Sequence, residues 1–158
     1  MQFPKSTEYS SYYRFYIEQL PERDPLLLLQ QTWTYAEAVL AKVTPEQYDY
    51  AYAPSKWTIK QVLSHIVDTE HILSYRALRF ARGDVQSALP FDQDAYVAAT
   101  ATDDLDWQHL LQGWRQLRGY TQTQFAQYGP AIAGRGGSPA FPCTVRAVAA
   151  IVAAHGQH

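Results

Sequence analysis

Apolar residues recur at spacings of three, four and seven along four long segments, a pattern typical of helices with one buried face. The predicted helices cover residues 25–43, 59–82, 103–128 and 145–158. Each follows a residue whose side chain can cap a helix N-terminus: Asp24, Thr58, Thr102 and Thr144. Residues that stop helices follow the first three segments: Pro45, Gly83 and Gly129. The fourth helix has no stop signal, so we expect it to reach His158.

The remaining segments are an N-terminal arm, residues 1–23, and two long connections. Thr7–Leu20 carries five aromatic side chains, and we expect a short helix laid across the other four. The alternative is an extended arm that packs its tyrosines on a neighbouring subunit. The connection 83–102 is long for a helical bundle, which indicates a functional or mobile loop. The glycine-rich connection 129–143 lacks the Gly-Lys-Ser/Thr of a phosphate loop, so we interpret it as a connector.

No segment alternates apolar and polar residues for long enough to predict a sheet. The sequence therefore predicts an all-α fold, a four-helix bundle, in one domain over residues 1–158. The composition of 47% hydrophobic and 18% charged residues excludes a disordered chain.

Charge and hydropathy narrow the function classes. A net charge of -2 without Lys/Arg clusters argues against nucleic acid as a partner. The longest apolar run, Ala147–Ala154, is far shorter than the roughly 20 residues that a membrane span needs. The N-terminus lacks the apolar core of a signal peptide, so we expect a cytoplasmic protein with no membrane partner. A single cysteine, Cys143, excludes a disulfide framework.

Histidines on two of the predicted helices could share a metal ion. His155 continues the apolar stripe of the last helix, and His158 lies three residues further on the same side. His65 lies beside the apolar stripe of the second helix. Three imidazoles with one open position are the arrangement of a catalytic zinc-type site. The alternative is that these are core, boundary or solvated histidines, as we expect for His71 and His109.

One part of the sequence resembles a known family. The run WTIKQVLSHIVDTE at Trp57–Glu70, followed by Arg76, resembles the second helix of the DinB-like superfamily, and Thr144–His158 resembles its last helix. The resemblance extends over about residues 24–158. It implies a four-helix bundle of up-down-down-up style with long loops, often dimeric.

The resemblance also implies a ligand set. The family's usual metal ligands are one histidine on the second helix and two on the fourth, four residues apart. His65 and His155 match two of them, and the third would be residue 159. We therefore expect either that His158 takes this place or that the natural chain continues.

The activity implied by the resemblance is that of a divalent-metal-dependent enzyme. Such a metal activates water or a low-molecular-weight thiol, which makes the protein a hydrolase or a thiol S-transferase acting on a small molecule. Imidazole ligands suit zinc or nickel, with iron or manganese as further options. The alternative is a non-catalytic homodimer whose aromatic surface acts as a binding module.

Three charged residues on the second helix could support this site. Asp68 lies three residues from His65 and could orient its imidazole, although a solvated acid is the default interpretation. Glu70 lies about 140° around the helix from His65, so we expect it to hold Arg76 or a group on the fourth helix rather than the metal. Arg76 is either an anion hook for a substrate carboxylate or a salt-bridge partner.

Two further features have simpler interpretations. Tyr48, Tyr50 and Tyr52 alternate before Pro54, so they could line a pocket mouth, although packing is the default. Cys143 lies at a helix start, where a thiol pKa is lowered, but nothing else marks it as a nucleophile.

Overall fold

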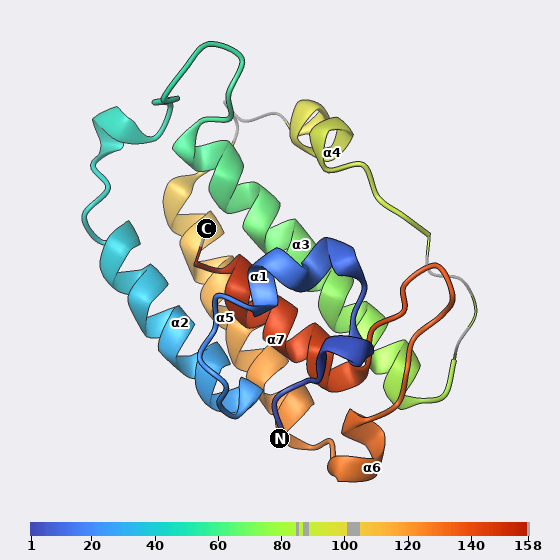
Figure 1. Cartoon of the computed structure of the whole chain (residues 1–158). Coiled ribbons are helices and arrows are strands. Elements are labelled where there is room, and N and C mark those ends of the chain that lie inside the picture. Colours follow the sequence, from blue (N-terminus) through green and yellow to red (C-terminus); the bar gives the residue numbers. More distant parts are fainter. Residues whose placement is uncertain (85, 87–88, 101–104, 158) are drawn as a thin grey trace.

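The computed structural model describes residues 1–84, 86, 89–100 and 105–157, and in these residues the regular structure is helical. The four long helices are α2 (Pro25–Leu40), α3 (Ile59–Ala81), α5 (Trp107–Ala126) and α7 (Val145–His155). Figure 1 shows that α2 and α7 run one way and α3 and α5 the other, an up-down-down-up order. The prediction of an all-α four-helix bundle is confirmed.

Short elements join the long helices. They are η1 (Ser6–Glu8), η2 (Ser11–Tyr13), α1 (Arg14–Ile17), η3 (Pro45–Gln47), α4 (Gln93–Ala99) and α6 (Pro130–Ala133). The N-terminal segment crosses α7 as expected, but as separate turns rather than one helix (Figure 1). Ile17 and Leu20 are buried and fix this segment to the core.

Helix caps explain most of the boundaries. Thr58 and Gln61 form the predicted capping box of α3, in which the N–H of Gln61 donates to Thr58 Oγ1 at 3.2 Å and the N–H of Thr58 donates to Gln61 Oε1 at 2.9 Å. Asp24 and Thr144 cap α2 and α7, also as predicted. The predicted third helix is wrong at Leu105 and Asp106, which are not helical, because α5 begins at Trp107.

The cap of α5 is Asp106, whose carboxylate accepts a hydrogen bond of 2.8 Å from the N–H of His109. Trp107, the first residue of the helix, is buried and anchors this end. Thr102, the predicted cap, lies outside the described residues. The first helix also ends earlier than predicted, at Leu40, and the last helix ends at His155 rather than continuing, because Gly156 is its C-cap. The two long connections contain the short helices α4 and α6.

The apolar run of the last helix forms the centre of the molecule. Every residue from Val145 to Ala154 except Arg146 is buried, and α7 packs against α2, α3 and α1. Its many alanines let the neighbouring backbones approach closely. This packing places His155, the last residue of α7, beside the second turn of α3. Within the described part of the chain, no helix combines the length and apolar character that crossing a lipid bilayer requires.

Candidate functional site

Two of the predicted histidines lie side by side. His65, on the second turn of α3, and His155, at the end of α7, have ring centroids 5.0 Å apart and ring planes at 65°. Both residues are half-buried. The sequence predicted that each would lie next to an apolar stripe, and the packing of α3 on α7 brings the two stripes together.

Neighbouring side chains hold the His65 ring. Trp57 lies against it, with centroids 4.8 Å apart, and the Thr69 hydroxyl is 3.5 Å from its Nδ1. Burial lowers the pKa of His65, and the charges of Asp68 and Asp94 only partly offset this, so the imidazole is neutral near pH 7. A neutral imidazole is the form that binds metal ions.

Asp68 was the sequence candidate for orienting His65, but the hydroxyl group that lies near the ring is that of Thr69. Thr69, four residues from His65 and not singled out in the sequence, has the hydroxyl in reach of Nδ1. Asp68 interacts with His65 through its charge, and burial raises the pKa of its carboxyl group. The i,i+4 spacing on a helix was the available signal for Thr69.

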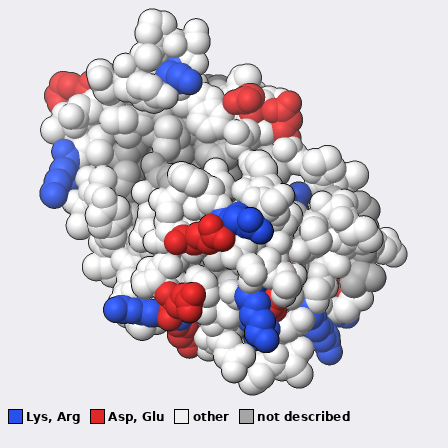
Figure 2. Space-filling model, in the orientation of Figure 1, with Lys and Arg blue, Asp and Glu red and all other residues white. Residues whose placement is uncertain are grey.

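A cavity of about 810 Å³ opens beside the two imidazoles. Residues of α3 form one wall, and the N-terminal segment, residues 90–93 and residues 140–142 form the others. A space of this size accommodates a small organic molecule. Charged side chains on the face shown in Figure 2 form scattered groups of both signs rather than one basic patch.

Arg76 lines the same cavity. Its side chain is buried, with 6% of the residue exposed, and Nη2 donates to the carbonyl oxygen of Leu89 at 2.8 Å. Its guanidinium carbon lies 4.6 Å from the centroid of the Phe141 ring. Among the described residues, no carboxylate lies within ion-pair distance of Arg76, so no salt bridge of the predicted kind is found there.

Glu70 has a different partner from the one expected. It accepts hydrogen bonds from Trp114 and Arg118 of α5, each 2.8 Å from Oε2. The side chains of Glu70 and Arg118 are both 2% exposed. The sequence did not predict these two partners, because a single sequence does not specify that α5 faces Glu70.

Arg118 links three helices. Besides Glu70 on α3, its Nη1 donates to the carbonyl oxygen of Leu29 on α2 at 3.2 Å. A small space beside the Glu70–Arg118 pair is lined by both of these residues and by His155 and Gly156 at the end of α7. The buried ion pair therefore lies directly behind His155. The sequence did contain an indication that Arg118 is buried, because it lies next to the apolar stripe of its helix, four residues after Trp114.

The comparisons with known proteins fit this architecture. The family model of the DinB superfamily matches residues 28–158. The chain belongs to the DinB superfamily. Among solved structures, this DinB-superfamily protein is similar to YfiT from Bacillus subtilis, with 17% sequence identity and a TM-score of 0.75 over 98% of this chain and 85% of that chain. YfiT is described as a probable metal-dependent hydrolase with an unusual four-helix bundle topology. No curated protein matches the chain.

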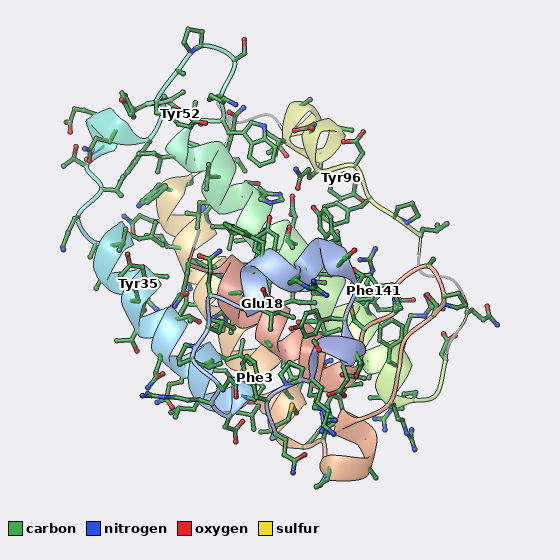
Figure 3. The ribbon with its side chains drawn as sticks, in the orientation of Figure 1. Phe3, Glu18, Tyr35, Tyr52, Tyr96 and Phe141 are labelled. Carbon is green, nitrogen blue, oxygen red and sulfur yellow. The ribbon has the colours of Figure 1, made fainter. Side chains whose placement is uncertain are left out.

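This DinB-superfamily protein has a second cavity, of about 730 Å³, on the α2 side of the bundle. Tyr50 and Tyr52 line it, whereas Tyr48 stacks on Trp107 with ring centroids 4.4 Å apart. Two of the three tyrosines thus lie at a cavity, which was the alternative interpretation, and only Tyr48 is the packing residue that the default interpretation predicted. Figure 3 shows Tyr52 on this side, across α1 from Phe141 at the first cavity.

The other candidates lie apart from the histidine pair. The side chain of His109 is 86% exposed, and His71 is exposed as well. Burial raises the pKa of Cys143 to about 11, which agrees with an unreactive thiol. His158, the third predicted ligand, lies outside the described residues, and within those residues no three His, Cys, Asp or Glu side chains converge as a metal site.

Proposed function

We propose that this protein is a divalent-metal-dependent enzyme in which His65, His155 and His158 hold the ion. The observation that carries the proposal is the pairing of two imidazoles from separate helices, 5.0 Å apart, in the wall of a cavity that fits a small molecule. The description of YfiT as a probable metal-dependent hydrolase supports the same assignment.

Histidine nitrogens are suitable ligands for a divalent metal ion. Imidazole nitrogens suit zinc or nickel, and iron or manganese are further options. His65 and His155 supply two donors, and His158 follows three residues after His155 in the sequence. When bound, the ion would supply Lewis-acid activation of a water molecule or a low-molecular-weight thiol at neutral pH.

The chain's own residues prepare the site. Trp57 covers one face of His65 and restricts access of water to it. Thr69 can fix the tautomer and orientation of the same ring, the role that second-sphere partners have in metal sites. The buried Glu70–Arg118 pair behind His155 supports the end of α7 and positions the second imidazole.

Metal content tests the proposal. Untagged protein is purified, incubated with zinc or nickel, desalted and measured by mass spectrometry. We expect one ion per chain in the wild type and loss of that ion in His65→Ala and His155→Ala. His71→Ala is the matched control, because His71 is exposed on the same helix as His65. Full retention of metal in both site variants contradicts the ligand assignment.

The reaction class is tested separately. The metal-loaded protein is assayed with an activated ester, for hydrolysis, and with an aryl halide plus a low-molecular-weight thiol, for S-transfer. A hydrolase releases acid from the ester without thiol, whereas an S-transferase consumes the halide only with thiol. Turnover that is equal in wild type and His65→Ala contradicts metal-dependent catalysis in either form.

A second candidate function is a non-catalytic homodimeric binding module. The observation that favours it is the cluster of exposed aromatic residues around the second cavity, where Tyr50 is 59% and Tyr52 73% exposed. Aromatic side chains are enriched at the centres of protein interfaces. A protein that binds no added zinc or nickel but sediments as a dimer supports this candidate. Under either candidate we propose a cytoplasmic homodimer without nucleic acid or membrane partners.

A further inference from the structure

The cavity beside the histidine pair extends along α3 to Arg76. The helix residues that line it share one face of the helix, with spacings of three or four apart from the adjacent pair His65 and Ile66: Val62, His65, Ile66, Thr69, Leu73 and Arg76. His65 and Arg76 are eleven residues apart, which is about 16 Å of helix rise and nearly a whole number of turns. The two side chains therefore lie on one face of α3, at separate positions along the same cavity.

Arg76 lacks an anion among the described residues. Its nearest polar partners are neutral, the carbonyl oxygen of Leu89 and the hydroxyl group of Tyr13. The acid that lines the same cavity, Asp92, caps α4 and accepts two hydrogen bonds of 3.0 Å from the N–H groups of that helix. Burial lowers the pKa of the guanidinium, as expected for a charge held away from water without a counter-ion.

The surroundings of Arg76 favour a planar anion. Phe141 covers the guanidinium in a cation–π contact. Tyr13 lines the cavity, and burial raises its pKa to about 12, so its hydroxyl group keeps a proton that it can donate. An arginine offers two parallel N–H donors, which match the two oxygens of a carboxylate.

Apolar and aromatic side chains also line the cavity. Leu73 and Ile151 line it from α3 and α7, and Phe91 lines it from the connection before α4. Leu73 lies between His65 and Arg76 along α3, so a ligand that reaches both of these residues also meets an apolar side chain. This order of groups describes an elongated molecule with one charged end.

From these contacts we infer that the substrate is an elongated organic carboxylate, with its carboxylate bound by Arg76 and Tyr13 and its reacting group beside His65 and His155. The inference rests on the proposed function for the role of the histidines, but the carboxylate site is a separate property of the chain. Arg76 acts here as a specificity-determining residue.

Binding of a matched pair of probes tests this site. Phenylvalerate and its neutral analogue phenylvaleramide share the aromatic ring and the chain length, and their affinities are measured by isothermal titration calorimetry. We expect the wild type to prefer the carboxylate by about tenfold or more, the value of a charged hydrogen bond in a buried site. Arg76→Gln should reduce this preference to within about twofold while amide binding stays unchanged.

Two control variants make the result specific. Arg115→Gln removes an exposed arginine that pairs with Glu37 on the bundle surface, and it should keep the preference of the wild type. Arg76→Lys keeps the charge but lacks the two parallel donors, so it should retain part of the preference for the carboxylate. Unfolding curves of every variant show whether it is folded.

The outcomes separate this inference from the metal assignment. His65→Ala should keep the carboxylate preference even where it loses the ion, and Arg76→Gln should keep the ion. A wild type that does not discriminate between the probes overturns the inference. A preference that persists in Arg76→Gln but disappears in His65→Ala places the anion on the metal and also overturns it.

Discussion

Gly137 lies where no larger side chain fits. An added Cβ would meet the carbonyl oxygen of Phe141 and come within 2.7 Å of the Phe80 ring. Since Phe141 covers Arg76, this glycine also determines how closely the 129–143 connection approaches the cavity.

Gly137→Ala should therefore destabilise the protein by about 1–3 kcal/mol, the usual cost of overpacking a filled site. Urea unfolding measures the change. Gly136→Ala is the matched control, because a Cβ at the neighbouring position meets nothing within 4 Å. If both substitutions destabilise the protein equally, the contacts of an added Cβ with Phe141 and Phe80 are not the cause of the loss.

Among the elements, α3 contributes most to the candidate site, because it carries both His65 and Arg76. Its first turn is closed by the capping box of Thr58 and Gln61, which satisfies backbone groups that otherwise lack partners. The position at which α3 begins determines which of its residues face the cavity.

Thr58→Ala should reduce the free energy of unfolding by about 1 kcal/mol, because the helix loses its N-cap. Chemical denaturation monitored by circular dichroism measures the loss. Thr34→Ala serves as the control, since Thr34 is exposed inside α2 and caps nothing. A loss in Thr34→Ala as large as in Thr58→Ala would contradict the capping explanation.

At the scale of the whole molecule, the buried Glu70–Arg118 pair joins α2, α3 and α5. Removing one partner leaves a buried charge without compensation. Arg118→Met should therefore cost about 3–5 kcal/mol, whereas Glu70→Met with Arg118→Met should cost less than the sum of the two single changes. A double-mutant cycle from urea unfolding measures the coupling, and strict additivity would show that the pair does not act as a unit.

The N-terminal segment is tied to α7 by a second ion pair. Arg146 Nη2 lies 2.7 Å from Glu8 Oε1, and the N–H of Thr144 donates to the carbonyl oxygen of Glu8 at 2.9 Å. Burial alone would raise the pKa of Glu8, but the hydrogen bonds from Arg146 and the N–H of Lys5 outweigh it and lower the pKa below 4.5.

A lowered folded-state pKa means that the Glu8 carboxylate stabilises the fold above its unfolded-state pKa, and that this stability is lost as the pH falls through the folded-state value. Glu8→Gln should therefore be less stable than the wild type by about 1 kcal/mol or less at pH 7, and the difference should disappear in acid. Thermal unfolding across this pH range measures it. A difference that is constant with pH would exclude the ion pair as its source.

The sequence by itself determined the elements of this protein. Helical periodicity, the caps at Asp24, Thr58 and Thr144, and the placement of His65 and His155 beside apolar stripes are all local properties, set by residues within a turn or two of each other. For this reason the four-helix bundle could be predicted.

Only the tertiary structure decided which side chains meet. Glu70 binds Arg118, which is 48 residues away, and the histidine rings meet across 90 residues, counted from His65 to His155. The cavity likewise needs the N-terminal segment and the loop with Phe141 to close on α3. The physical reason is that contacts between distant residues depend on which helix faces overlap when the apolar surfaces pack, and no local spacing encodes that choice.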